Sequence, residues 1–343
     1  MLNCQRGLLS AASTQSFSTA AANPAAPGAL PIAPAIPIPA PPFSLARLAS
    51  DYAELFKLRI GLMIVITAWA GYYLGCLRSG ISSFNPQLLL ALFGVFLAAC
   101  GSGALNQAME RVFDARMIRT SHRPMAAGRI GLLHGLLAGL SMVAAGVILL
   151  ALKTNLITAT LSLLTVFLYV AVYTPLKRFT TLATFIGAFP GAMPPLLGWT
   201  AARGILEWPA IALFAILFVW QFPHFMAIAW LYREDYARAG IRMLPVVEPD
   251  GRSTVTQALV YAVLMVPVSL IPCWLGLAGW TYGTAAALLS AGYLLATVRF
   301  ANILRARSES ESRRYARDLL KVSVIYLPLL LGALMLAARA PAR

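Results

Sequence analysis

Long apolar segments alternate with short polar segments along most of this chain. Nine of them have the roughly 20 residues that a transmembrane helix needs: 60–78, 87–109, 131–151, 155–173, 181–202, 209–232, 255–277, 279–298 and 319–338. The connections at 151–155 and 277–279 are short, which predicts tight turns there. The pattern therefore predicts an all-α integral membrane protein with nine transmembrane helices.

The basic residues fall mainly on one side of this predicted arrangement. With the N-terminus inside, 22 of the 27 lysines and arginines belong to the inside segments or to the span ends beside them. Inside loops of membrane proteins carry such an excess. Adding or losing one span midway would remove the bias. We therefore expect nine spans and a cytoplasmic N-terminus.

The composition supports the membrane assignment and narrows the partners. Charged residues make up 11% of the 343 residues, whereas soluble domains carry roughly 25%. The net charge of +15 is spread over membrane loops, so orientation explains it. We therefore expect the protein to contact a lipid bilayer and not to bind nucleic acid.

The first fifty residues contain no acid and end in a proline/alanine tract. Proline at that density favours extended chain over a spanning helix. We expect a disordered tail at 1–50 before a single domain at 51–343. A mitochondrial transit peptide is the alternative, but only Arg6 and Arg47 are basic there. The bacterial inner membrane is therefore the expected location, with the mitochondrial inner membrane as the alternative.

A polar stripe follows the second predicted span. Asn106, Glu110 and Asp114 recur every four residues, so they share one face of a helix. Two carboxylates and an amide on one face can hold a hard divalent cation. Arg119 and Arg123 follow directly, and arginine binds phosphate well. The stripe predicts a diphosphate site at the membrane surface.

The sixth predicted span leads into a second inside loop with acids, Glu234 and Asp235. Carboxylates at a span end are costly unless they are paired or bind a metal ion. With two such loops on one side of the membrane, a shared site and simple ion pairing explain the acids equally well. In the ion-pairing alternative, Glu110 and Asp114 only form ion pairs with neighbouring arginines, namely Arg111, Arg116 or Arg119.

Four blocks closely resemble the protohaem IX farnesyltransferases, which belong to the UbiA-type intramembrane prenyltransferases. The similarity runs from about residue 50 to the end. The blocks are Asn106-x3-Glu110-x3-Asp114-x2-Met117-x-Arg119-Thr120-x2-Arg123-Pro124, then Tyr173–Arg178, Gly187–Trp199, and Gln221–His224 with Asp235–Pro245. Long motifs in the right order are a specific signal.

The resemblance implies nine helices around a central cavity. It implies transfer of the farnesyl group of farnesyl diphosphate to a vinyl group of protohaem IX (haem B). The product would be haem O, which serves respiratory terminal oxidases. Mg²⁺ would bridge the diphosphate to the acidic motifs. Haem A synthase and terminal oxidase assembly factors are the protein partners that the resemblance suggests.

On this basis the catalytic and metal-binding residues are expected to be Asn106, Glu110, Asp114 and Asp235. The expected diphosphate contacts are Arg119, Arg123, Lys177 and Arg178. Membrane topology alone is an equal explanation for the last two. Relatives often carry a second aspartate four residues after the one that matches Asp235, but this chain has Ala239 there. The second half of the metal site is therefore expected to be weaker, unless Glu234 compensates.

The cavity candidates are Tyr173, Gln221 and His224. His224 either ligates haem, whose iron favours imidazole, or hydrogen-bonds across helices, for example with Gln221. Aromatic rings could stabilise an allylic cation or only pack; the candidates are Tyr173, Trp220, Phe222 and Tyr236. The fifth span contains three prolines, which predicts a kinked or broken helix on the cavity wall.

Two other functions remain open from sequence. The first is a polyprenyltransferase that acts on a quinone precursor or a chlorophyll-type acceptor. The second is a transporter or a structural assembly factor. Transporters place their charged residues near the midplane, whereas the acids here lie at the inside rim. This favours an enzyme.

Overall fold

The computed structural model describes residues 33–37 and 44–339, and this part of the chain is helical with no β-strand. The long helices are α2 (Leu58–Ser79), α3 (Pro86–Asp114), α4 (Leu132–Lys153), α5 (Leu156–Phe167), α7 (Ala183–Arg203), α8 (Trp208–Leu231), α11 (Arg252–Trp274), α12 (Trp280–Phe300) and α13 (Glu309–Ala337). The shorter elements are α1 (Leu45–Leu55), a π-helix η1 (Leu168–Tyr173), α6 (Thr174–Leu176), α9 (Arg233–Arg238), α10 (Leu244–Val247) and a 3₁₀-helix η2 (Ala301–Arg305).

The helix limits follow from local capping. Asn85 accepts a hydrogen bond from the backbone N–H of Leu88 at 3.0 Å, and Pro86 follows at the first helical position of α3. Asn155 caps α5 in the same way. Ser44 caps α1, so helix begins at Leu45, inside the range 1–50 expected to be a tail. The rest of that expectation falls on residues 1–32 and 38–43, outside the described part.

The helix count agrees with the nine predicted spans within the described residues. Eight helical segments are long and apolar enough to cross a membrane, with α5, η1 and α6 acting as one segment. The remaining predicted span is the fifth, 181–202, which corresponds to α7, whose 21 residues include Pro190, Pro194 and Pro195. These residues lower its hydropathy, but the helix is continuous rather than broken. Most of α7 is buried between its neighbours.

Two glycines let α7 pack directly against the backbone of α2. A Cβ on Gly71 would lie 1.9 Å from the carbonyl oxygen of Pro195, and one on Gly198 would lie 1.8 Å from that of Ala68. No larger side chain fits at either contact. The same close approach occurs between α3 and α4 at Gly101, where a Cβ would meet the Gly139 carbonyl oxygen at 2.6 Å. Small residues commonly allow such packing in membranes.

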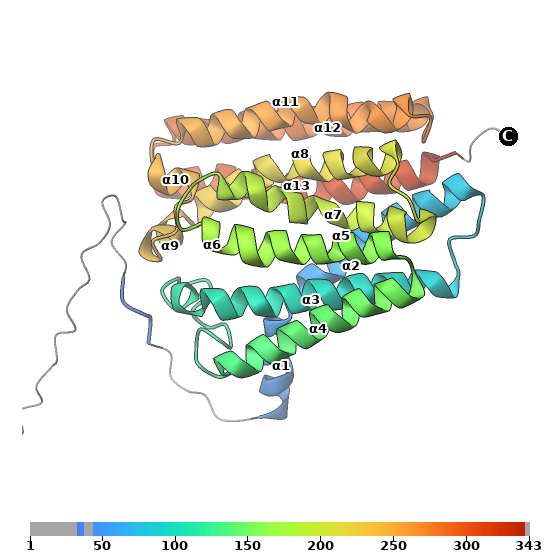
Figure 1. Ribbon diagram of the computed structural model, residues 1–343. Coiled ribbons are helices and arrows are strands. Elements are labelled where there is room, and N and C mark those ends of the chain that lie inside the picture. Colours follow the sequence, from blue (N-terminus) through green and yellow to red (C-terminus); the bar gives the residue numbers. More distant parts are fainter. Residues whose placement is uncertain (1–32, 38–43, 340–343) are drawn as a thin grey trace, which may run out of the picture. The chain divides into compact units, whose positions relative to one another are not determined.

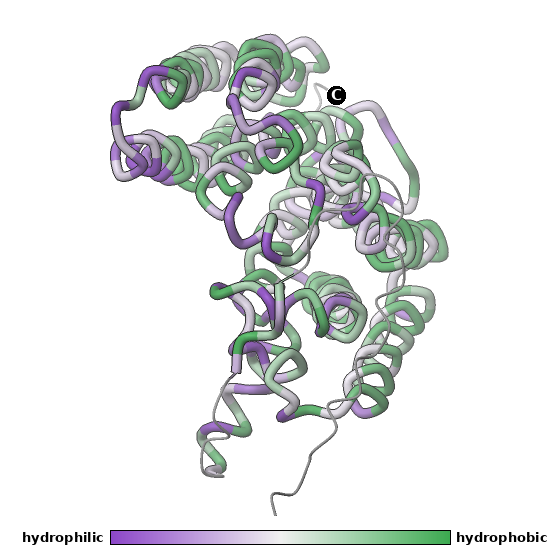
Figure 2. Tube along the Cα trace, turned by 90° about the vertical axis from the view of Figure 1, so that its left-hand side faces the viewer, coloured by the Kyte–Doolittle hydropathy of each residue, from purple (hydrophilic) through white to green (hydrophobic). Residues whose placement is uncertain are grey.

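The polar connections that the sequence assigns to the inside gather at one end of the helices, on the left in Figure 1. They include the loop after α3, the α6 end of the fourth span, and α9 with α10. Figure 2 looks onto this end and shows hydrophilic residues concentrated in the loops. The loops after α3 and α8 are joined by a buried apolar cluster of Met117, Tyr236, Ala239 and Ile241. The N-terminal residues Ala33 and Ile36 also donate backbone hydrogen bonds to these two loops.

Candidate active site

The polar stripe lies in the last turns of α3, as the sequence predicts. Asn106, Glu110 and Asp114 share one face, and each is at most 4% exposed. At 1.5 Å per residue, the 29 residues of α3 span roughly 43 Å, whereas the hydrocarbon core is about 30 Å thick. The last turns of α3, which carry the stripe, can therefore extend to the membrane surface. Its polar groups are buried by protein.

Lys57 reaches this stripe from the start of α2. Its Nζ donates hydrogen bonds to Asn106 Oδ1 at 2.6 Å and to the Tyr169 hydroxyl at 3.3 Å. The backbone of Lys57 has φ 50°, the one left-handed non-glycine conformation in the described residues. Such a conformation costs of order 1–3 kcal/mol and is frequent at functional sites. The sequence pattern alone does not identify Lys57 as a site residue, because a lone lysine before a span looks like a topology signal.

Both carboxylates of the stripe form ion pairs, but with partners other than those that helix spacing suggests. Glu110 pairs with Lys177, and Asp114 Oδ2 accepts a hydrogen bond from Arg123 at 2.8 Å. The neighbours Arg111, Arg116 and Arg119 form neither pair. The cations therefore come from the end of the fourth span and from the loop after α3.

The fourth span reaches the site through the π-helix η1. A π-turn changes which side chains lie on a given face of the helix. Such turns are frequent at functional sites. Tyr169 and Tyr173 stack with ring centroids 5.8 Å apart, and the Thr174 hydroxyl accepts a hydrogen bond from Asn106 Nδ2 at 3.0 Å. One short segment thus supplies two aromatic rings and, through Lys177, a cation.

The electrostatic environment differs between the two lysines. Burial, followed by repulsion from Arg123, lowers the pKa of Lys57 to about 7 despite the attraction of Glu110 and Asp114. Burial also opposes protonation of Lys177, but Glu110 outweighs it and raises the pKa of Lys177. At neutral pH Lys57 is thus poised to gain a proton when an anion arrives.

The polar pocket leaves one acceptor and one donor unused. Asp114 Oδ1 and Arg119 Nε are buried and have no hydrogen-bond partner among the described residues. Both residues line the same pocket of about 140 Å³, as do Lys57, Glu110, Arg123 and Lys177. A cation can satisfy an unused carboxylate oxygen, and an anion can accept a hydrogen bond from an unused guanidinium N–H. The residues therefore fit a divalent cation that carries an anionic ligand.

An apolar chamber of about 480 Å³ adjoins the polar pocket. Lys57, Arg119, Tyr169, Tyr173, Tyr236 and Met243 line both spaces. Helix α7 forms part of the chamber wall with Gly187, Pro190, Gly191, Pro194 and Leu197, which confirms its predicted place. The volume lies within the range of about 300–1,000 Å³ that is usual for small-molecule sites.

Asp235 differs from the sequence expectation. Its carboxylate accepts backbone hydrogen bonds from Ile118 at 3.0 Å and Arg119 at 3.2 Å, and it pairs with Arg238. It does not line the polar pocket. The described residues contain no group of three or more histidine, cysteine, aspartate or glutamate side chains that could hold a metal ion. Asp235 thus links the loop after α3 to α9, and its carboxylate lies apart from the stripe of Asn106, Glu110 and Asp114 that lines the pocket.

Of the predicted residues Arg178, Gln221 and His224, only one lines the apolar chamber. Arg178 stacks on Phe113, with its guanidinium carbon 4.1 Å from the ring centre, and does not line the polar pocket. Gln221 lines the apolar chamber. His224 lines neither space; its Nδ1 lies 2.8 Å from the Ser323 hydroxyl. The structure therefore shows the interhelical hydrogen bond, with Ser323 rather than Gln221 as partner.

The aromatic candidates divide in the same way. Tyr173 and Tyr236 line both the pocket and the chamber, as does Tyr169, which was not predicted from the sequence. Trp220 donates a hydrogen bond to the Ser323 carbonyl at 2.9 Å. Phe222 stacks on Tyr261. Neither of these last two rings lines the site.

Comparison with known proteins places this geometry in a family. The model of the "UbiA prenyltransferase family" matches residues 64–325. A "Protoheme IX farnesyltransferase" of Koribacter versatilis is 49% identical over 300 residues, which cover 88% of this chain and 97% of the relative.

Solved structures agree with this assignment at the level of the fold. One described as "Digeranylgeranylglyceryl phosphate synthase in membranes" superposes with a TM-score of 0.68 at 20% identity, over 85% of this chain and 98% of the other. A UbiA homolog from Archaeoglobus fulgidus "bound to GPP and Mg2+" gives 0.52 at 15% identity, over 83% and 99%. The chain belongs to the UbiA prenyltransferase family.

Proposed function

We propose that this chain transfers the farnesyl group of farnesyl diphosphate to a vinyl group of protohaem IX and so forms haem O for respiratory terminal oxidases. The observation that carries the proposal is a polar pocket with one unused acceptor and one unused donor, which opens into an apolar chamber. A prenyl diphosphate has a matching polar head and apolar tail. The relative from Koribacter versatilis supports protohaem as the acceptor.

The polar pocket would bind the diphosphate. Lys57, Arg119, Arg123 and Lys177 line it together with two carboxylates, so basic side chains exceed acidic ones by two. In the free protein, Lys177 and Arg123 neutralise the carboxylates. We infer that they turn toward phosphate oxygens when the ligand binds.

Asn106, Glu110 and Asp114 would hold Mg²⁺, and Asp114 Oδ1 supports this assignment because it lacks a partner. Magnesium retains several waters, so few protein oxygens are needed. When bound, the ion supplies charge neutralisation to the departing diphosphate. Asp235 would join this metal site only after its carboxylate gives up its hydrogen bonds with the backbone N–H groups of the loop after α3.

The chain's own residues would carry the rest of the reaction. The C–O bond between farnesyl and diphosphate breaks, and its electron pair leaves with the diphosphate. Tyr169, Tyr173 and Tyr236 would face the allylic cation where pocket and chamber meet. The vinyl group attacks this cation, and water then adds a hydroxyl group and loses a proton. The apolar chamber would exclude other water until that step.

The charge pattern supports a location for this chemistry. The pocket lies at the end of the helices that carries the basic loops, which the positive-inside rule assigns to the cytoplasm. We infer a bacterial inner membrane, in which farnesyl diphosphate would enter from the cytoplasmic side.

The test is pigment analysis with matched variants. The chain is expressed in cells that lack haem O. The extracted haems are separated by chromatography and identified by mass spectrometry. We expect haem O with the native chain and with Arg178→Met, but at most about 1% of it with Lys177→Met, since removal of one charge-stabilising group costs 10²–10³ in rate. A prenylated quinone precursor in place of haem O would contradict the proposal.

A further inference from the structure

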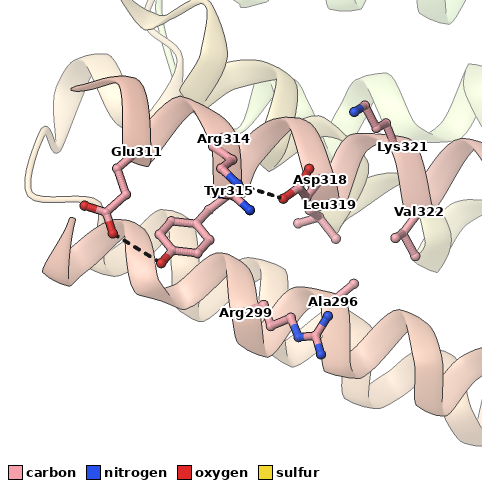
Figure 3. A pocket seen from close by; sticks show the side chains of 9 residues that line it. All are labelled: Ala296, Arg299, Glu311, Arg314, Tyr315, Asp318, Leu319, Lys321 and Val322. Carbon is pink, nitrogen blue, oxygen red and sulfur yellow. Dashed lines mark hydrogen bonds and ion pairs between the residues drawn. The ribbon is translucent and has the colours of Figure 1, made fainter. Parts of the chain in front are cut away.

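A second polar cavity lies away from the prenyl diphosphate pocket, between the inside ends of α12 and α13 (Figure 3). Its volume is about 500 Å³. Arg299 borders it from α12, while Arg314, Asp318 and Lys321 border it from α13. Ala296, Leu319 and Val322 form its apolar part. We call this cavity the α12–α13 groove.

The groove contains positive charge that the protein does not neutralise. Its acids already have partners: Asp318 lies 4.0 Å from Arg314, and Glu311 accepts hydrogen bonds from the Tyr315 hydroxyl at 3.3 Å and the Arg307 backbone at 2.9 Å. Among the described residues, no ion pair or hydrogen bond engages the side chains of Arg299 and Lys321. These two exposed cations are therefore available to an external anion.

The groove lies where the polar surface gives way to lipid-facing surface. Helix α13 has 29 residues, roughly 43 Å at 1.5 Å per residue, so its first turns extend beyond a hydrocarbon core of about 30 Å. Lys321 is its last charged residue, and Arg299 is the only one in α12. Just beyond them, exposed apolar side chains flank the groove, namely Leu295, Val298, Val324 and Ile325.

We propose that the α12–α13 groove binds the phosphate headgroup of an anionic phospholipid of the inside leaflet. Arg299 and Lys321 would contact the phosphate, and an acyl chain would lie along the exposed apolar residues beyond them. Basic pockets between transmembrane helices on this side of a membrane suit such headgroups. A soluble phosphate shares the headgroup chemistry but gains nothing from the apolar flank. The proposal is independent of the farnesyl transfer reaction.

The experiment compares two double variants of equal charge change. Arg299→Ala with Lys321→Ala removes the groove cations, whereas Arg305→Ala with Arg317→Ala removes two exposed arginines outside the groove. Each purified full-length protein is incubated in detergent with equal amounts of phosphatidylglycerol and phosphatidylcholine that carry identical acyl chains. Native mass spectrometry then counts the lipids retained. Farnesyl transfer and the thermal midpoint verify that each variant is folded.

For the native protein and the Arg305/Arg317 variant we expect retention of phosphatidylglycerol over phosphatidylcholine. The groove variant should lose roughly 25-fold in affinity for phosphatidylglycerol, from about 1 kcal/mol for each of two cations. Equal loss in both double variants would overturn the proposal, because a diffuse surface charge would then explain binding. Displacement of the lipid by millimolar inorganic phosphate would overturn it as well, since the groove would then be a site for soluble phosphate.

If the groove variant fails to fold, Arg299→Gln alone serves in its place, with Arg317→Gln as its control. Retention by Arg299→Gln equal to that of its control would overturn the proposal in the same way.

Discussion

Replacing Lys57 by methionine should make the protein more stable and less active. Lys57 is held in a left-handed backbone conformation, with its ammonium group among Asn106, Tyr169 and the cations of the pocket. Methionine has a similar length and no charge. If the Lys57 charge serves to bind diphosphate, its removal should increase the stability of the ligand-free protein and weaken diphosphate binding.

The magnitude follows from the lowered pKa. A change from 10.5 to about 7 corresponds to about 5 kcal/mol against the charged form. Lys57 is only partly buried, so we halve this value to about 2.5 kcal/mol for residual hydration. The lost hydrogen bond to Asn106 subtracts about 1 kcal/mol. A net gain of about 1.5 kcal/mol is left, which raises the thermal midpoint by about 3 °C at about 2 °C per kcal/mol.

The pH dependence of this gain has a defined sign. The folded-state pKa lies below the unfolded value, so protonation of Lys57 costs stability below pH 7 and the cost fades between about pH 7 and pH 10.5. Thermal midpoints of native and Lys57→Met protein should therefore differ most at or below pH 7 and converge at high pH. Fluorescence-detected size-exclusion chromatography after heating measures them in detergent.

The same preparations are titrated with farnesyl diphosphate. We expect at least a tenfold loss of affinity for Lys57→Met, because a buried charged hydrogen bond contributes about 1.5–3 kcal/mol, while Lys57→Arg should keep most of the affinity. A lower midpoint at pH 7 together with unchanged affinity would refute the reasoning. Lys57 would then be a structural residue.

Further outcomes follow from the same site. Glu110→Gln and Asp114→Asn should each reduce haem O formation 10²-fold or more with the protein still folded, as haem extraction and size-exclusion chromatography will show; normal turnover in both would exclude the metal site. Arg123→Ala should raise KM for farnesyl diphosphate at least tenfold; a change confined to haem affinity would contradict its role. The kcat/KM for farnesyl diphosphate should fall as pH rises above about 7, because Lys57 must be protonated to bind the diphosphate; a fall that persists in Lys57→Arg would assign it to another group. Asp235→Asn should lower the thermal midpoint by a few degrees, since it weakens the bond between two loops; a loss of activity without loss of stability would instead favour a metal-binding role.

Much of the architecture could be predicted because the membrane imposes it. An apolar run of about 20 residues has few alternatives to a spanning helix, and the basic loops indicate the inside end. The stripe of Asn106, Glu110 and Asp114 was predictable for a similar reason. Helical spacing alone puts these residues on one face, whatever packs against them.

The partners of the stripe depend on contacts that the sequence does not encode locally. Lys57 and Asn106 are 49 residues apart in the sequence, and Asp114 and Arg123 are nine apart. Only the packed helices and the folded loop bring each pair into contact. Lys177 and Arg178 are neighbours in sequence, yet one pairs with Glu110 and the other stacks on Phe113. A step of one residue turns a helix by about 100°, and the preceding π-helix sets which of the two faces inward.

Local hydropathy and periodicity were thus enough to predict the helices and the shared face of the acidic stripe, because neither depends on what packs against them. The tertiary fold sets which charges meet. It brought Lys57 into the site, and it directed Asp235 to the backbone of the loop after α3, where two N–H groups and Arg238 satisfy its carboxylate. A buried charge needs a partner wherever the fold offers one, and spacing along the chain does not reveal where that will be.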